Sequence, residues 1–152
     1  MNSRDADLAD TAAAELSRLL GPLRRAVLRT TRSAEDLPDL PEAQIELLRV
    51  LTDGALAAGE AATRLRVAPS TVSNLVKTMR AAGLVDRTAH PDDARTVLLV
   101  ATGAAHDLLA RYDRASATAL ARGIADLSPA DRATLHEALP VLGRLTSGLE
   151  RV

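Results

Sequence analysis

Apolar residues recur at spacings of three and four along most of this chain, which is the pattern of amphipathic helices. The first such stretch runs from Leu8 to Val27 and predicts one long helix. Pro22 lies inside it and has no backbone N–H to donate, so we expect a kink there rather than an end. A second helix is predicted to open at Pro41 and to bury Ile45 and Leu48.

Two shorter helices are predicted in the middle of the chain. The first spans about residues 58–65, and Arg66-Val67-Ala68 forms the turn that follows it. The second begins at Pro69 or Ser70 and runs to Ala82. Gly83 then ends this helix, because glycine adopts the left-handed conformation that terminates helices without a steric penalty.

A β-hairpin is predicted directly after these helices, since Leu84–Thr88 and Thr96–Val100 flank a turn formed by His90–Arg95. Two packed helices followed by a hairpin are typical of a winged helix-turn-helix, a module that binds duplex DNA. Arg95 at the tip is placed to enter a minor groove, whose negative potential attracts guanidinium groups. Its other predicted role is a local salt bridge with Asp93 that shapes the loop, and the two roles are compatible.

The helix from residue 69 to 82 has two unlike faces. Val72, Leu75, Val76 and Met79 would pack inward at helical spacing. The opposite face predicts a DNA contact, in which Ser73 and Asn74 reach base edges and the other polar residues reach phosphates or bases. An ordinary solvated helix face is the alternative, but the hairpin signal that follows favours DNA. The predicted contact residues on this helix are Ser70, Thr71, Ser73, Asn74, Lys77 and Thr78.

Two further helices are predicted in the last third of the chain. Thr102 can cap the first of them, and Ser128 with Asp131 forms a capping signature for the second. Neither helix has an obvious partner in so small a module, so we expect both to pack on the first helix and on a second copy of the chain. The predicted fold is mainly α with a small β-hairpin wing, divided into a winged helix-turn-helix domain at 37–101 and a helical dimerisation region at 1–36 and 102–152.

Composition and charge narrow the class of partner. Tyr112 is the one aromatic residue, which argues against single-stranded nucleic acid because such ligands stack on aromatic rings. The formal charge is −3 over residues 1–56, +2 over 57–100 and 0 over 101–152, so the small positive excess coincides with the predicted DNA-binding domain. The chain has no Cys and no apolar run long enough to cross a bilayer, and we expect a cytoplasmic location.

Several motifs in the predicted helices and hairpin resemble those of the MarR family of transcriptional regulators. The similarity covers about Pro41 to Ala105, and it implies a homodimer that binds a pseudo-palindromic duplex site, with Arg87 and Arg95 among the DNA contacts. Family members often carry a basic residue at the positions of Asn74 and Thr88, so we expect weaker nonspecific DNA binding here. Binding should still be markedly sensitive to salt, with a modest slope of affinity against salt concentration. The resembling segments are Ala68-Pro69-Ser70-Thr71-Val72-Ser73, Ala82-Gly83-Leu84-Val85-Asp86-Arg87, Asp92-Asp93-Ala94-Arg95 and Ala101-Thr102.

The resemblance also implies regulation by a small-molecule effector. In that family an effector often binds between the dimerisation helices and the DNA-binding module, and we expect this chain to be a repressor. The candidate pocket residues here are Leu16, Leu20, Leu48 and Tyr112, although a role in the hydrophobic core explains the leucines equally well.

Catalysis is not expected. His90, His106 and His136 are scattered without the spacing of metal ligands, and no Gly-rich phosphate loop is present. We therefore predict a protein that is not an enzyme and that uses no metal or cofactor. A winged-helix module that binds protein rather than DNA remains the alternative function.

Overall fold

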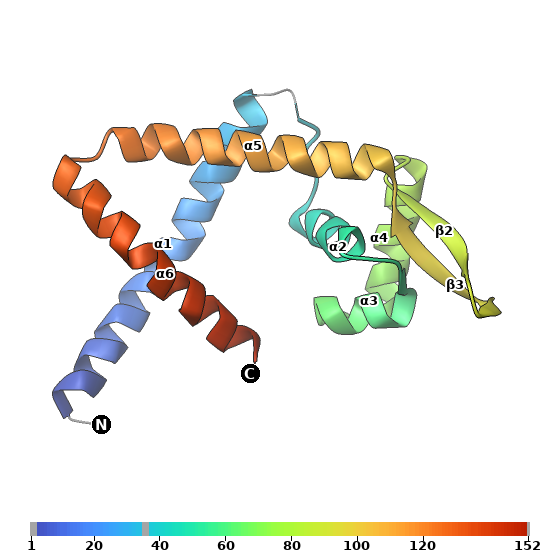
Figure 1. Cartoon of the computed structure of the whole chain (residues 1–152), viewed down its shortest axis with the longest axis horizontal. Helices are drawn as coiled ribbons and strands as arrows, with labels where there is room; N and C mark the ends of the chain where they lie inside the picture. The colour runs from blue at the N-terminus through green and yellow to red at the C-terminus, as the bar shows by residue number, and fades with distance from the viewer. Residues whose placement is uncertain (1–2, 35–36, 152) are drawn as a thin grey trace. The chain divides into compact units, whose positions relative to one another are not determined.

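The computed structural model describes residues 3–34 and 37–151, and its architecture is the predicted mainly helical fold with a small β wing. Figure 1 shows the order of the elements along the chain. These are α1 (Ser3–Ala34), α2 (Glu42–Thr52), β1 (Leu56–Ala57), α3 (Ala58–Leu65), α4 (Pro69–Ala81), β2 (Val85–His90), β3 (Asp93–Ala101), α5 (Gly103–Ala125) and α6 (Pro129–Glu150).

Internal contacts divide the chain into two compact units. We call residues 31–115 the winged-helix unit, and residues 1–30 together with 116–152 the terminal-helix unit. The division falls later in α5 than the predicted boundary at residue 101, because the first half of this helix packs into the winged-helix core. Its contributions to that core are Ala105, Leu108, Leu109, Tyr112 and Ala115.

The hydrophobic core of the winged-helix unit lies between α2, α3, α4, α5 and the small sheet. Leu47 and Leu48 of α2 are fully buried, and Val72 and Met79 of α4 are buried with them. Each helix thus buries one apolar stripe, as the spacing predicted. The apolar face of α4 packs against this core, and its polar face is exposed to solvent.

Both ends of α4 are defined by local backbone geometry. Pro69 occupies the first turn, where its missing N–H is harmless. At the other end Gly83 adopts a φ of 72°, as predicted, and the N–H of Leu84 donates to the carbonyl of Met79 at 2.9 Å. Thr102 Oγ1 donates to the Gly83 carbonyl at 2.7 Å and accepts from the Ala105 N–H at 3.3 Å, so one side chain joins the end of α4 to the start of α5.

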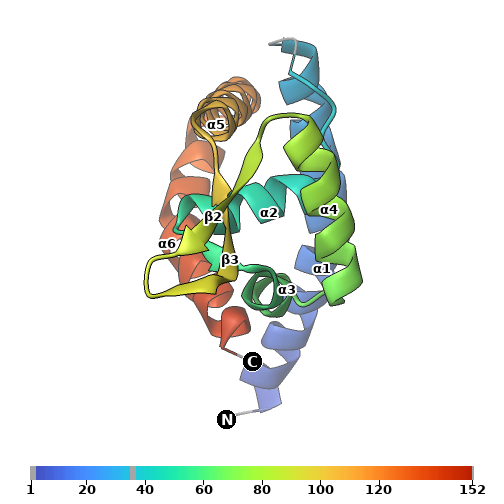
Figure 2. The ribbon, with the colours of Figure 1, turned by 90° about the vertical axis from the view of Figure 1, so that its right-hand side faces the viewer.

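The wing is part of a three-stranded antiparallel sheet of order β1-β3-β2. Figure 2 shows its two longer strands, β2 and β3. The prediction missed β1, whose two residues are too few to form a pattern but pair with Leu99 and Leu98 of β3. The predicted turn of His90–Arg95 was too long, because His90 pairs with Asp93 and only two residues separate the strands. The ladder is irregular near the tip, because its register shifts between the Ala89–Val97 pair and the His90–Asp93 pair.

The terminal-helix unit is built differently. Its helix α1 continues through Pro22, as predicted, and α6 begins at the predicted cap, where Ser128 Oγ accepts from the Asp131 N–H at 3.1 Å. Among the residues of this unit whose burial is described, no hydrophobic side chain is buried. Across the described ranges, no helix combines the length and hydropathy that a bilayer crossing requires.

Candidate nucleic-acid interface

The outward face of α4 is the ridge that the sequence predicted. All six predicted contact residues on this helix are exposed, from Ser70 to Thr78. Two hydroxyls on it already donate to the backbone one turn earlier: Ser73 Oγ to the Pro69 carbonyl at 3.1 Å, and Thr78 Oγ1 to the Asn74 carbonyl at 3.2 Å. In this arrangement those hydroxyls offer a ligand their lone pairs, whereas the Asn74 amide can both donate and accept.

A polar groove of about 580 Å³ runs between α4 and β2. It is an open depression, and its walls carry three cationic side chains and no carboxylate. Sequence reasoning did not single out Arg80, although its position three residues after Lys77 places both on one helix face. The groove is lined by Ser73, Asn74, Lys77, Arg80 and Ala81 of α4 and by Arg87 of β2.

The register of the sheet explains why Arg87 joins this groove. Side chains on a strand alternate between its two faces, so Arg87 lies on the same face as the buried Val85. Its partner across the ladder is Leu99, which is also buried. Arg87 therefore extends from the core side of the sheet. Strand β2 contacts α4, and Figure 1 shows these two elements near each other.

Hydrogen bonds within the tip of the wing differ from the predicted salt bridge. The carboxylate of Asp93 accepts from the backbone N–H of Arg95 at 3.0 Å and from Thr96 Oγ1 at 2.7 Å. Both hydrogen bonds lower the pKa of Asp93, and the bond from Thr96 has the larger effect. Within the described ranges no ion pair joins Asp93 to the Arg95 guanidinium, because the carboxylate is taken up by the turn itself. The Arg95 side chain is exposed at the tip of the wing.

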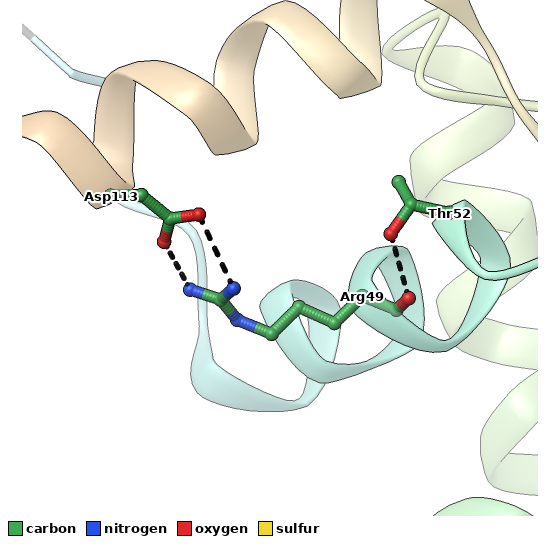
Figure 3. A network of polar contacts seen from close by, with 3 residues as sticks. All are labelled: Arg49, Thr52 and Asp113. Atoms are coloured by element: carbon green, nitrogen blue, oxygen red, sulfur yellow. Dashed lines mark hydrogen bonds and ion pairs between the residues drawn. The ribbon is translucent and has the colours of Figure 1, made fainter.

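Helix α2 is tied to α5 by an ion pair that the sequence did not predict. Arg49 Nη2 lies 2.6 Å from Asp113 Oδ1, and Nη1 lies 3.5 Å from Oδ2, as Figure 3 shows. The hydrogen bond that Arg49 donates to the Asp113 carboxylate is the main reason that the pKa of Arg49 is raised. The Thr52 hydroxyl donates to the Arg49 carbonyl at 2.7 Å in the same network. No local pattern could reveal a pair separated by 64 residues.

The four predicted effector residues fall in different surroundings. Leu48 and Tyr112 belong to the buried core of the winged-helix unit, where the Tyr112 hydroxyl donates to the Pro38 carbonyl. Leu16 and Leu20 belong to the terminal-helix unit, and Leu20 is exposed. The effector site therefore stays a prediction. In the described part of the chain, no three His, Asp or Glu side chains gather as a metal site would require.

In comparisons with known proteins, this chain is similar to transcriptional regulators. A sequence model of the MarR family matches residues 39–96. The uncharacterized HTH-type transcriptional regulator Mb0904 of Mycobacterium bovis is 29% identical over 130 residues, which are 83% of this chain and 91% of that protein.

Two solved structures extend this likeness to the fold. The crystal structure of Rv1404 from Mycobacterium tuberculosis superposes with a TM-score of 0.75 and 25% identity, covering 97% of this chain and 96% of that one. A mutant of S. aureus MepR bound to an oligodeoxyribonucleotide gives a TM-score of 0.63 at 18% identity, over 88% of this chain and 96% of that one, a level that shows the fold alone.

Proposed function

Because the chain belongs to the MarR family of winged-helix transcriptional regulators, we propose that it binds a specific duplex DNA site through α4 and the β2–β3 wing. The observation that carries this proposal is the exposed polar ridge of α4 beside a groove lined only by cations and neutral side chains. A ridge of this kind fits a major groove, where hydroxyls and amides can reach base edges. The MepR mutant of the same fold, bound to an oligodeoxyribonucleotide, supports DNA as the ligand.

The proposed contacts divide into two kinds. Asn74 and Ser73 read base edges, while Lys77 and Thr78 reach either bases or the backbone. Ser70 and Thr71 lie in the first turn of α4, where the N–H groups and the helix dipole favour a phosphate. Arg95 enters the adjacent minor groove from the tip of the wing, aimed by the turn that Asp93 holds.

We propose that the protein acts as a homodimer. The terminal-helix unit exposes apolar side chains on all its helices, including Leu23, Leu120 and Leu145, and such surface is stabilised when a second copy covers it. A two-fold dimer presents two copies of α4 to successive major grooves about 34 Å apart, which calls for an inverted repeat in the DNA.

Repression, with release by a small molecule, is the regulatory role that we propose. A dimer on a site that overlaps a promoter excludes the transcription machinery. An effector that lowers occupancy 100-fold must favour the DNA-incompetent arrangement by about 2.7 kcal/mol. A regulator of this kind works where the chromosome is, which agrees with the cytoplasmic location expected from the sequence.

A titration of the purified full chain against the DNA upstream of its own gene tests the proposal. We expect a retarded complex at low salt with micromolar protein, and weaker binding as salt rises. A complete absence of any complex with duplex DNA would favour the alternative of a protein-binding module.

Two substitutions separate the proposed roles. Arg95→Ala should weaken binding to all sequences by a similar factor, because a minor-groove cation senses shape and potential. Asn74→Ala should also change which sequences are preferred, since it removes an amide that reads a base. Equal effects of both substitutions on every DNA would contradict this division.

A further inference from the structure

Three cations surround the groove between α4 and β2 without a compensating acid. Within the described ranges, no ion pair includes Lys77, Arg80 or Arg87, whereas Arg49 and Arg64 both have carboxylate partners. Like charges around one depression repel one another, and an anion in that depression removes the repulsion. The groove is therefore suited to bind an anionic group.

The nearest acid in sequence does not neutralise the groove. Asp86 precedes Arg87 on β2, so its side chain projects from the opposite face of the sheet. Its carboxylate accepts from the backbone N–H of Arg87 at 2.7 Å, which holds it at the strand rather than at the guanidinium. Because side chains alternate along β2, the Asp86 carboxylate and the Arg87 guanidinium lie on opposite faces of the sheet.

We propose that this groove holds a backbone phosphate of the bound DNA, and that Arg80, together with Arg87, is the contact. The inference rests on the proposed DNA-binding function and assigns a role to a residue outside the predicted set. Arg80 lies six residues after Asn74, about 9 Å further along the helix axis, so it reaches a different part of the DNA. A guanidinium fork matches the geometry of a phosphate, and two forks from different elements would fix its position.

This contact sets the register of α4 on the duplex. A phosphate clamped at the C-terminal end of α4, together with the phosphates expected at its N-terminal end, would hold the helix at two points. Ser73 and Asn74 lie between those points, where the bases are read. Phosphate contacts of this kind position a protein without carrying sequence information themselves.

The test replaces single DNA phosphates by neutral methylphosphonates, one position at a time, in the site bound by the full-length protein. For the wild type, one position per half-site should lose affinity by roughly tenfold, as expected for a charge-assisted hydrogen bond. Arg80→Ala should lose a similar factor for each half-site on unmodified DNA. It should lose clearly less than the wild type on replacement at that position, because only Arg87 still contacts the phosphate there. Its salt slope should fall by about one for each half-site.

Arg132→Ala is the matched control, because it removes one exposed arginine from α6 in the other unit. It should leave the response to every methylphosphonate unchanged. If Arg80→Ala behaves like Arg132→Ala while the wild type binds DNA, the inference is wrong and the proposed function stands. If Arg80→Ala instead alters sequence preference, Arg80 reads a base and the phosphate assignment is overturned. If the wild type binds no DNA, the proposed function itself fails.

Discussion

The two units of this chain use the same kind of sequence pattern and reach opposite results. Leucines at helical spacing in α2 become fully buried, as Leu47 and Leu48 do in the winged-helix unit. Leucines at similar spacing in α6 stay in solvent, with Leu145 45% and Leu149 65% exposed. Among the residues whose burial is described, all of the exposed large hydrophobic side chains except Val67 and Val97 belong to the terminal-helix unit.

This difference separates a unit that completes its own core from one that does not. The winged-helix unit covers its apolar stripes with a sheet and further helices of the same copy. The terminal-helix unit spreads long helices that leave their stripes uncovered within one copy. An amphipathic pattern thus identifies the apolar face of a helix without telling what covers that face.

The largest expected effect concerns the completed core. Leu48→Ala should lower the free energy of unfolding by about 2–5 kcal/mol, because it leaves a cavity among fully buried neighbours. Urea unfolding followed by circular dichroism measures this change. The dimerisation constant of the folded protein should stay the same, and a shift in that constant would show that the winged-helix core depends on the second copy.

A leucine of the uncovered unit should respond in the opposite way. Leu145→Ala should weaken dimerisation by about 1.5–3 kcal/mol, the value of burying one leucine, as measured by sedimentation at several concentrations. Val97→Ala is the matched control, since Val97 is 49% exposed on β3 in the winged-helix unit. Equal dimerisation by both variants and the wild type would contradict the proposed interface.

A smaller effect is expected where α5 is held to the winged-helix unit. A double-mutant cycle of Arg49→Ala and Asp113→Ala should give a coupling of about 0.2–1 kcal/mol, because both side chains are about half exposed. Unfolding of the four proteins at low and high salt measures the coupling and its screening. The Glu60–Arg64 pair within α3 is the reference for a purely local ion pair, at about 0.3–0.5 kcal/mol. A coupling free energy of zero at low salt would show that the Arg49–Asp113 ion pair does not stabilise the packing of α5 on α2.

The smallest effect concerns the tip of the wing. Thr96→Val removes the hydroxyl that contributes most to the lowered pKa of Asp93, so this pKa should rise toward its ordinary value, as NMR titration of the carboxyl group would show. Because the folded pKa is depressed, the turn is stabilised above the ordinary pKa of the carboxyl. That stabilisation is lost as the pH falls through the lowered value. An unchanged titration in Thr96→Val would contradict the role given to this hydrogen bond.

Local features of the fold were predictable to within a few residues. The helix predicted at about 58–65 is α3, Gly83 ends α4 in the left-handed conformation, and Thr102 and Ser128 cap the helices that follow them. These signals work because a cap or a glycine acts on backbone groups within one turn of itself. The polar face of α4 was equally visible, since it depends on a period within a single helix.

Features that join distant segments escaped prediction. Strand β1 exists because two residues meet the edge of β3, and the Arg49–Asp113 pair exists because α5 crosses α2. The sequence also placed Arg87 in a motif without showing that it faces Arg80. Such contacts depend on how completed elements pack, which no local spacing encodes.

The sequence by itself determined where helices begin and end, which faces are apolar, and that a polar helix face precedes a hairpin. Only the tertiary structure decided which apolar faces are covered within one copy, where α5 divides between the units, and which cations share a groove. The physical reason is the range of the interactions. Capping and helical periodicity act over a few residues, whereas burial and charge clustering are properties of surfaces that form only when separate elements meet.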